Sequence, residues 1–526
     1  MASVGEFLVT LLARYGVDTI FGIPGVHTAE LYRGLTGSPI RHITPRHEQG
    51  AAFMADGYAR ASGKPGVCLL ITGPGLTNAL TAMGQAYADS IPMLVITAVN
   101  RLGELGSGSG YLHEVSDQRR ISAPVTAFSH TITRADELPQ VIARAFAVFA
   151  AARPRPVHIE IPLDLIMASA DDLTLPESAP VVMPPVASEA GLALAASWLS
   201  DAKSPVILAG GGAVSASAGI RALAERLDAP VVMTINARGL LPPSHPLAVS
   251  VSPSFPAVRA LIAGADCVLA IGTEMGPTDY DMYATGAMPK PRRLIRVDRD
   301  PEQAMRSFVA DLTLTGDAAL TADALAARVA AGAHDGAARA ARTMRAGLAE
   351  LESGTRRDIA ILHTLRDALP EVLIVGDSTR QVYAGNLGFA ANAPRSWFNA
   401  ATGFGALGYG LPAAIGAALA NPKRPVVCLA GDGGLQFTLA EMGAATEAGV
   451  RVIVFLLNNS GYSEIKQFMQ GKSITPLGVD LFTPDFQAIA RAFGWHAEML
   501  ADISGLPLAV QTAAARPGCS LIEWRD

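Results

Sequence analysis

Short apolar runs alternate with Ala- and Leu-rich stretches of helical period along most of the chain. Three of the apolar runs, at 67–71, 93–96 and 452–457, consist almost entirely of Val, Ile, Leu, Met, Phe and Cys. A strand that is apolar at every position is typical of a parallel sheet with helices on both faces. The alternation of such runs with helical stretches therefore predicts an α/β fold.

Two stretches interrupt this alternation and predict linkers between domains. One is the Pro-rich segment 176–185, and the other is the Ala/Gly-rich polar segment 330–354. The length of 526 residues corresponds to about three domains at roughly 150 residues each. We therefore expect three domains at 1–175, 186–335 and 352–526, each with a mostly parallel sheet flanked by helices.

The composition excludes some classes of function. Half of the residues are hydrophobic, 17% are charged, and the mean hydropathy is +0.30, which excludes a disordered or fibrous chain. The net charge is −6 without a block of Lys or Arg, so no nucleic-acid or membrane partner is expected. The four cysteines lack metal-ligand spacing, and no export signal or membrane-spanning run stands out. These features predict a cytoplasmic protein with a small-molecule substrate.

Two glycine patterns leave alternatives open. The turns at 73–75 and 431–433 are each followed by a helical stretch and a strand, which indicates either a duplication or a chance similarity. The glycines at 210–212 follow an apolar strand. They indicate either a nucleotide-binding turn or a plain tight turn.

The segment Gly431-Asp432-Gly433-Gly434 follows the apolar strand 426–430 and precedes a predicted helix. Asn459 closes the next strand, 27 residues after Asp432. Parallel β-α-β geometry returns both residues to the same edge of the sheet. Their side-chain oxygens and the carbonyl of Gly461 are the kind of ligand that Mg²⁺ prefers. The glycines also allow backbone N–H groups to approach an anion.

With this spacing, the segment resembles the Mg²⁺-diphosphate motif of thiamine-diphosphate enzymes. The resemblance extends over nearly the whole chain, through 21–25, 46–52, 72–78 and 89–92. It is a resemblance to acetolactate synthases and their 2-oxo acid decarboxylase relatives. It implies thiamine diphosphate and Mg²⁺ as cofactors, held by a pyrimidine-binding, a central and a diphosphate-binding domain.

The resemblance implies roles for individual residues. Asp432, Asn459 and the Gly461 carbonyl would bind the metal, and the Gly405 carbonyl would accept a hydrogen bond from the aminopyrimidine. Leu407 would wedge the cofactor's bent conformation, although on its own it is typical of a core residue. Ser378 and Thr379 would contact the diphosphate, and Ser378 on its own is typical of a helix cap. The other implied cofactor positions are Gly25, Thr72, Asn78, Gly403, Gly431, Gly433, Gly434 and Tyr462.

Glu48 stands at the start of a predicted helix. A lone glutamate there is typically solvated and favourable to the helix dipole. The family, however, activates its cofactor with a glutamate in this His-Glu setting, so the resemblance implies that Glu48 bonds the pyrimidine ring nitrogen. Because family members bring this domain against the diphosphate domain of another subunit, it also implies a homodimer at minimum, and commonly a homotetramer.

The substrate positions depart from family patterns. Pyruvate decarboxylases have an Asp where Val26 stands, next to His27, and a His-His pair where His113 stands alone. His113 is therefore either a proton relay or an ordinary hydrogen-bonded histidine. Phe468 replaces the Trp of acetolactate synthases, and the segment associated with FAD is missing at 251–255, so no flavin is expected.

Glu464 follows Asn459 by five residues, where many relatives place an apolar side chain. An enclosed carboxylate needs a partner, which favours a cationic substrate tail such as a guanidinium. The alternatives are a pair with Lys466, contact with solvent, or a role as proton donor. An acidic loop of the central domain could assist: Glu274, Asp279 and Asp281.

The resemblance implies non-oxidative decarboxylation of a 2-oxo acid. The pattern at 22–28 and 112–114 resembles decarboxylases of 2-oxoarginine, which convert 5-guanidino-2-oxopentanoate to 4-guanidinobutanal and CO₂ in arginine catabolism. The alternatives are a carboligase of the acetolactate-synthase type that condenses pyruvate, and a benzoylformate-like decarboxylase. A non-enzymatic protein that only binds the cofactor is disfavoured, because Glu48 and the metal ligands occur together.

Overall fold

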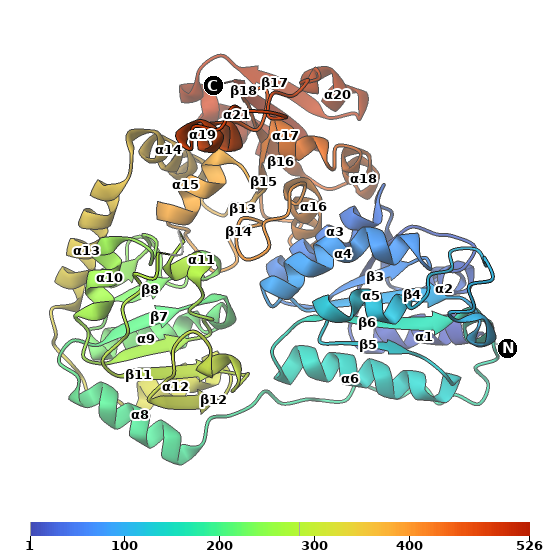
Figure 1. The fold of residues 1–526 in the computed structure, drawn as a ribbon, viewed down its shortest axis with the longest axis horizontal. Helices are drawn as coiled ribbons and strands as arrows, with labels where there is room; N and C mark the ends of the chain where they lie inside the picture. Colours follow the sequence, from blue (N-terminus) through green and yellow to red (C-terminus); the bar gives the residue numbers. More distant parts are fainter. Residues whose placement is uncertain (1, 283–284, 526) are drawn as a thin grey trace. The chain divides into compact units, whose positions relative to one another are not determined.

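The computed structural model describes residues 2–282 and 285–525 and contains three sheets of six parallel strands (Figure 1). The chain forms two compact units. The first comprises Met1–Met183, Phe404–Met499 and Ala513–Asp526, and the second comprises Pro184–Gly403 and Leu500–Thr512. The α/β fold expected from the alternating pattern is confirmed.

The first sheet has the strand order β2-β1-β3-β4-β6-β5. Its strands are β1 (Thr19–Gly22), β2 (Arg41–Ile43), β3 (Gly66–Leu70), β4 (Met93–Val99), β5 (Phe128–Thr131) and β6 (Pro156–Pro162). Its helices are α1 (Val4–Arg14), α2 (Ala29–Leu35), α3 (Glu48–Ser62), α4 (Pro74–Ala88), α5 (Gln118–Ser122), α6 (Leu138–Ala151) and α7 (Leu163–Ile166). Every residue of β3, β4 and β6 is buried, as expected for strands covered on both faces.

The second sheet has the order β12-β11-β10-β7-β8-β9, which is the strand order of a dinucleotide-binding fold. Its strands are β7 (Val206–Ala209), β8 (Val231–Met233), β9 (Ala248–Val249), β10 (Val268–Ile271), β11 (Leu294–Asp298) and β12 (Leu312–Thr315). The helices of this region are α8 (Glu189–Asp201), α9 (Ser217–Leu227), α10 (Pro256–Ala263), α11 (Pro277–Tyr280), α12 (Ala318–Arg328) and α13 (Gly336–Glu350).

The glycine turn after β7 packs against other backbone. A Cβ on Gly210 would lie 2.3 Å from the Gly272 carbonyl oxygen, and one on Gly212 would lie 3.0 Å from the Gly272 Cα. Glycine is needed at these positions because two turns of the sheet touch there. The contact supports the tight-turn alternative.

The third sheet has the order β14-β13-β15-β16-β18-β17. Its strands are β13 (Leu373–Gly376), β14 (Trp397–Asn399), β15 (Val426–Gly431), β16 (Val452–Asn458), β17 (His496–Leu500) and β18 (Ser520–Arg525). The helices of this region are α14 (Ser353–Ala368), α15 (Arg380–Gly388), α16 (Gly410–Ala420), α17 (Asp432–Gln436), α18 (Glu441–Ala448), α19 (Ser463–Gly471), α20 (Phe486–Ala492) and α21 (Leu506–Ala515).

Helices α3 and α16 pack against each other within the first unit through glycines. A Cβ on Gly57 would lie 2.0 Å from the Ala413 carbonyl oxygen, and one on Gly416 would lie 1.9 Å from that of Met54. The two helix backbones therefore approach more closely than side chains would permit. This contact fixes the helix that begins at Glu48 against the one that begins at Gly410.

The two expected linkers differ in structure. Residues 173–188 have no helix or strand, as predicted, whereas 330–354 contains the helix α13. Ala and Arg, which are strong helix formers, dominate this segment, so the expected linker is largely helical. Its role as a linker between domains stays a prediction. In the described part of the chain, no helix is long and apolar enough to cross a membrane.

Candidate active site

Glu48 lies at the carboxyl edge of the first sheet, in the segment that follows β2. It is the first residue of α3, and the side-chain amide nitrogen of Asn78 on α4 donates to its Oε2 at 2.9 Å. Strands β2, β1 and β3 are neighbours and parallel, so the segments that follow them gather at one edge. The structure thus brings together two residues that the sequence separates by 30 positions.

A histidine pair joins the segments that follow β1 and β4. His27 is buried, and its Nδ1 lies 2.9 Å from the Thr72 hydroxyl oxygen. The ring of His113 meets that of His27 edge-on, with centroids 5.1 Å apart. Burial is the main cause that lowers the pKa of His27, and the nearby His113 lowers it further. Both effects favour the neutral form of His27. Gly25 is held by the Thr28 hydroxyl, whereas Val26 beside it is 73% exposed.

Gln118 is a residue of this edge that the sequence reading missed. Its side chain is buried, its Oε1 accepts from the Gly73 N–H at 2.6 Å, and its Nε2 donates to Thr97 and Glu160. A Cβ on Gly73 would lie 2.4 Å from the His113 carbonyl oxygen. The loop that carries His113 therefore passes directly over a turn that Gln118 fixes.

Asp432 lies at the corresponding edge of the third sheet, where β15 ends. The residue is 1% exposed, and its Oδ1 accepts from the Asn459 N–H at 3.4 Å. Its Oδ2 is buried and has no hydrogen-bond partner among the described residues. Burial raises the pKa of Asp432, because the charged form has lost its water. A buried carboxylate oxygen in this state favours a cation beside it.

The side-chain amide of Asn459 supports this reading. One terminal atom of the amide lies 3.2 Å from Asp432 Oδ1 and 3.0 Å from the Gly461 carbonyl oxygen. With nitrogen in that position both contacts are hydrogen bonds, and with oxygen there, three oxygens converge. Octahedral Mg²⁺ with bonds near 2.1 Å separates adjacent ligand oxygens by about 3.0 Å. One carboxylate with an amide oxygen and a carbonyl oxygen is the type of ligand set that Mg²⁺ prefers, and binding of the metal here remains a prediction.

The glycines around Asp432 allow close packing. A Cβ on Gly433 would lie 2.5 Å from the ring of Tyr462. The Tyr462 backbone N–H donates to the Val479 carbonyl at 2.8 Å, which holds the start of α19 over this turn. Gly431 ends β15, and Gly434 lies in α17, a helix of only five residues. Because this helix is so short, its length alone does not support an anion site. The contact between these glycines and an anion therefore remains a prediction.

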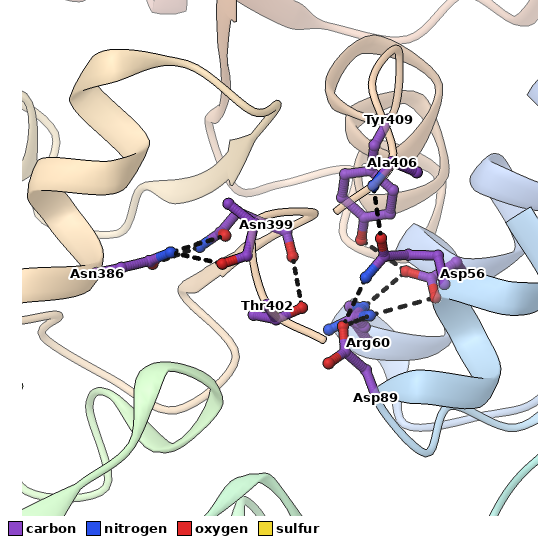
Figure 2. Close-up of polar contacts among 10 residues, drawn as sticks. Asp56, Arg60, Asp89, Asn386, Asn399, Thr402, Ala406 and Tyr409 are labelled. Carbon is purple, nitrogen blue, oxygen red and sulfur yellow. Dashed lines mark hydrogen bonds and ion pairs between the residues drawn. The ribbon is translucent and has the colours of Figure 1, made fainter. Parts of the chain in front are cut away.

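The segment 399–409 contains the predicted contacts with the middle of the cofactor. Gly405 has a φ of +78°, and Leu407 is partly exposed. The contact of Leu407 with the cofactor remains a prediction. In the second unit, the side chains of Asn386 and Asn399 bond each other in both directions, at 2.8 and 3.2 Å. Figure 2 shows this pair, and also the polar contacts of Ala406 and Tyr409 within the first unit. Gly403 lies between these two anchored ends and is exposed.

Ser378 and Thr379 follow β13 in the second unit. Thr379 is the N-cap residue of α15, so the alternative of Ser378 as the helix cap was wrong. The Ser378 N–H donates to the Asp377 carboxylate at 2.7 Å. The Ser378 side chain is partly exposed, and its contact with a diphosphate remains a prediction.

Glu441 is a second residue that the sequence reading missed. Its carboxylate is 1% exposed and accepts from the backbone N–H groups of Arg46 and His47, at 3.0 to 3.1 Å, just before Glu48. Burial, together with a smaller effect of the nearby Glu48, raises its pKa to about 7. A Cβ on Gly50 would lie 2.2 Å from this carboxylate. Glu441 therefore holds the segment from which α3 begins.

The predicted substrate residues lie in different surroundings. Glu464 is in the first turn of α19 and partly exposed, and Phe468 on the same helix is 62% exposed. Lys466 pairs with Asp480 at 2.7 Å, which disfavours the alternative of a Glu464–Lys466 pair. In the central acidic loop, Asp281 pairs with Arg259 and Asp279 accepts from the Ile235 N–H. These two aspartates therefore have structural partners.

Comparison with known proteins identifies the class. The thiamine pyrophosphate enzyme profiles match in order: the N-terminal TPP binding domain at residues 2–121, the central domain at 192–325, and the C-terminal TPP binding domain at 375–524. The chain belongs to the thiamine pyrophosphate enzymes.

Individual relatives cover almost the entire chain. The probable 2-ketoarginine decarboxylase AruI of Pseudomonas aeruginosa is 47% identical over 99% of this chain and 94% of its own length. The acetolactate synthase isozyme 1 large subunit of Escherichia coli is 33% identical over 99% of this chain and 93% of its own length. The probable acetolactate synthase large subunit of Methanocaldococcus jannaschii is 31% identical over 94% and 87%. The family resemblance inferred from the motifs is confirmed.

Proposed function

We propose that this chain is a cytoplasmic, Mg²⁺-dependent thiamine-diphosphate enzyme that decarboxylates 5-guanidino-2-oxopentanoate to 4-guanidinobutanal and CO₂. The observation that carries the proposal is the 47% identity to the probable 2-ketoarginine decarboxylase over nearly the full chain. In the balanced reaction, the carbon–carboxylate bond breaks, CO₂ leaves, and a proton takes its place on the new aldehyde carbon.

When bound, thiamine diphosphate would supply a nucleophilic thiazolium carbon for the 2-oxo group and a cationic ring that takes up the electron pair left when CO₂ departs. Glu48 would hold a proton at the pyrimidine ring nitrogen, oriented by the Asn78 amide at 2.9 Å. Asp432, Asn459 and the Gly461 carbonyl would hold Mg²⁺ and through it the diphosphate. The Gly405 carbonyl would accept from the aminopyrimidine.

His113 is our candidate for handling the proton that replaces CO₂. It lies against His27, whose Nδ1 bonds the Thr72 hydroxyl. This hydrogen bond fixes the ring that His113 packs against, and burial and the nearby His113 lower the pKa of His27. In this proposal, His113 would deliver the proton to the carbon atom that has lost CO₂.

Glu464 would recognise the guanidinium of the substrate. Its position five residues after Asn459 places it at the start of α19, and Lys466 on the same helix is paired with Asp480. A carboxylate and a guanidinium form a charge-assisted contact of two hydrogen bonds. Phe468 and Val26, both largely exposed in the single chain, would complete the pocket for the substrate's methylene groups.

We further propose that the active enzyme is a homodimer at minimum, most readily a homotetramer. Chains with Glu48→Gln and chains with Asp432→Asn would each be inactive. If each site combines Glu48 of one subunit with Asp432 of another, co-expression of the two variants restores activity, because a mixed dimer has one intact site. No recovery would place both residues of a site in the same chain.

The alternative is a carboligase that condenses two pyruvate molecules, favoured by the 33% identity to an acetolactate synthase. The purified protein is incubated with thiamine diphosphate, Mg²⁺ and one of 2-oxoarginine, pyruvate or benzoylformate, and CO₂, aldehyde and acetolactate are measured. We expect CO₂ and 4-guanidinobutanal from 2-oxoarginine. Acetolactate from pyruvate, with 2-oxoarginine inert, would refute the proposal, and turnover of benzoylformate alone would favour an aromatic substrate.

A further inference from the structure

A buried polar network ties residues 404–409 to helices α3 and α4 within the first unit. The Arg60 guanidinium lies between two carboxylates, with Nε 2.6 Å from Asp56 and Nη2 2.7 Å from Asp89. The Tyr409 hydroxyl donates to the same Asp56 carboxylate at 2.6 Å (Figure 2). All four side chains are nearly or fully inaccessible to water, where such a network rigidifies what it joins. The end of the loop at Tyr409 is thus fixed to α3.

Gln85 extends this network to the middle of the loop. It is fully buried, its Nε2 donates to Asp89 at 2.9 Å, and its Oε1 accepts from the Ala406 N–H at 3.3 Å. Reversing the side-chain amide would point its oxygen at a carboxylate and its NH₂ at an N–H group. Asp89 therefore determines which way the Gln85 amide faces.

The Ala406 N–H belongs to the same peptide group as the Gly405 carbonyl. A trans peptide is planar, and its N–H and C=O point in opposite directions, so fixing one direction fixes the other. Gly405 has a φ of +78°, in a region that glycine enters without steric penalty. The local backbone thus leaves this peptide free to rotate, and the hydrogen bond to Gln85 restrains it.

We propose that Gln85 is a positioning residue that directs the Gly405 carbonyl toward the aminopyrimidine of the cofactor. The inference rests on the proposed placement of the cofactor at Gly405. Gln85 acts through the peptide and does not itself contact the cofactor. Without its oxygen, the buried Ala406 N–H lacks an acceptor, and rotation of the peptide to satisfy it turns the carbonyl away.

The variant Gln85→Met tests the proposal, because methionine keeps the length of the side chain and removes the amide. Hydrogen–deuterium exchange at C2 of the bound cofactor is measured by acid quench and NMR, with Mg²⁺ and saturating thiamine diphosphate. Exchange should slow about tenfold to a hundredfold, the range for a buried donor left unsatisfied. Cofactor affinity should fall less, because the metal ligands are unchanged. An exchange rate equal to that of the wild type would overturn the proposal.

Tyr58→Phe is the matched control. Tyr58 is also on α3, is buried, and donates from its hydroxyl to Asp18 at 2.5 Å, so the variant removes one hydrogen bond away from residues 404–409. Its melting temperature should fall, with C2 exchange unchanged. If the control slows exchange as much as Gln85→Met does, the effect is general destabilisation and the proposal fails.

If Gln85→Met does not fold, Gln85→Asn replaces it, since the shorter amide stays polar but no longer reaches Ala406. Slow exchange supports the proposal, and wild-type exchange contradicts it. Because the exchange needs no substrate, failure of 2-oxoarginine to react would refute the proposed substrate and leave this test readable. Absence of exchange in the loaded wild-type enzyme would refute the cofactor placement itself, together with the role of Gln85.

Discussion

The first and third sheets share one strand order but have different chemistry at the same turn. In each, the second strand is outermost, followed by the first, third, fourth, sixth and fifth. After the third strand, Pro74 begins a 15-residue helix in one sheet and Asp432 begins a five-residue helix in the other. The shared order supports duplication over chance. The comparison indicates that the strand order places the turn after the third strand. The residues in that turn then determine whether it can bind a cation.

The same contrast holds after the second strand of each sheet. In the first sheet, α3 begins with Glu48, and in the third, α16 begins with Gly410. The two helices pack against each other through glycines. One half of the pair thus supplies a carboxylate and the other a glycine-rich loop, so two copies of one topology would serve opposite ends of a single cofactor.

The strongest way to break this comparison is Glu48→Gln. The first sheet would lose its proton-handling group, and kcat should fall about 10²- to 10⁴-fold, the usual contribution of general acid–base catalysis. Thiamine diphosphate should still bind, since the third sheet is unchanged, and calorimetry measures that binding. Glu30→Gln removes a surface partner of Arg33 and should leave kcat unchanged. A normal kcat in the Glu48 variant would contradict the assignment.

The variant Asp432→Asn tests the predicted metal site of the third sheet. Replacing the buried carboxylate should weaken Mg²⁺-dependent cofactor binding about 100-fold, because a neutral amide no longer balances the cation. Calorimetric titration with and without EDTA measures the effect. Asp485→Asn, the same change at the N-cap of α20, should leave affinity unaltered. Equal affinities in wild type and Asp432→Asn would remove the metal site from the third sheet.

Glu441 joins the two halves and gives a pH dependence of stability. Its pKa is raised by burial to about 7, so between pH 4.5 and 7 the folded state binds more protons than the unfolded state. Its stabilising protonated form is complete below pH 4.5 and is lost as pH rises through 7, a loss of roughly 3 kcal/mol. Relative to Glu441→Gln, wild-type melting temperature should therefore decline between pH 5 and 8. A constant difference would show that Glu441 does not titrate there.

Glu464→Leu has the smallest expected effect and sharpens the substrate side of the third sheet. Loss of a charge-assisted hydrogen bond should raise the KM for 2-oxoarginine about tenfold, and leave apolar 2-oxo acids nearly unaffected. Lys466→Met on the same helix breaks only the exposed pair with Asp480, which typically contributes 0 to 1 kcal/mol, and is the control. Equal effects of Glu464→Leu on both kinds of substrate would remove its recognition role.

The sequence predicted those site residues whose positions follow from the ends of strands or the start of a helix. Asp432 and Asn459 stand at the ends of two buried strands, and Glu48 stands at the start of a helix, so strand pairing and helix position place them. Gln85, Gln118 and Glu441 were missed because each is a single polar residue in a helix or loop, and its partner lies far away in sequence. For Gln85, its position as a polar residue in an otherwise apolar, Ala-rich stretch is the signal that could have found it.

The strands were predictable because they are buried on both faces and therefore apolar throughout. The helix α13 was not predicted because its buried face consists of small residues, which do not stand out as an apolar stripe: Gly336, Ala340, Thr343 and Gly347. Periodicity along the sequence thus predicted the strands and helices, whereas the side-chain contacts between them are visible only in the folded structure.

The central claim is that the first sheet supplies the activating carboxylate and the third sheet binds the cofactor. It is tested most directly by C2 hydrogen–deuterium exchange of thiamine diphosphate bound, with Mg²⁺, to the Glu48→Gln variant. The account predicts a cofactor that is bound at nearly wild-type affinity but exchanges its C2 proton at least about 100-fold more slowly. A C2 exchange rate equal to that of the wild type would contradict the account. So would a variant that binds the cofactor much more weakly but exchanges the C2 proton of the bound cofactor at the wild-type rate.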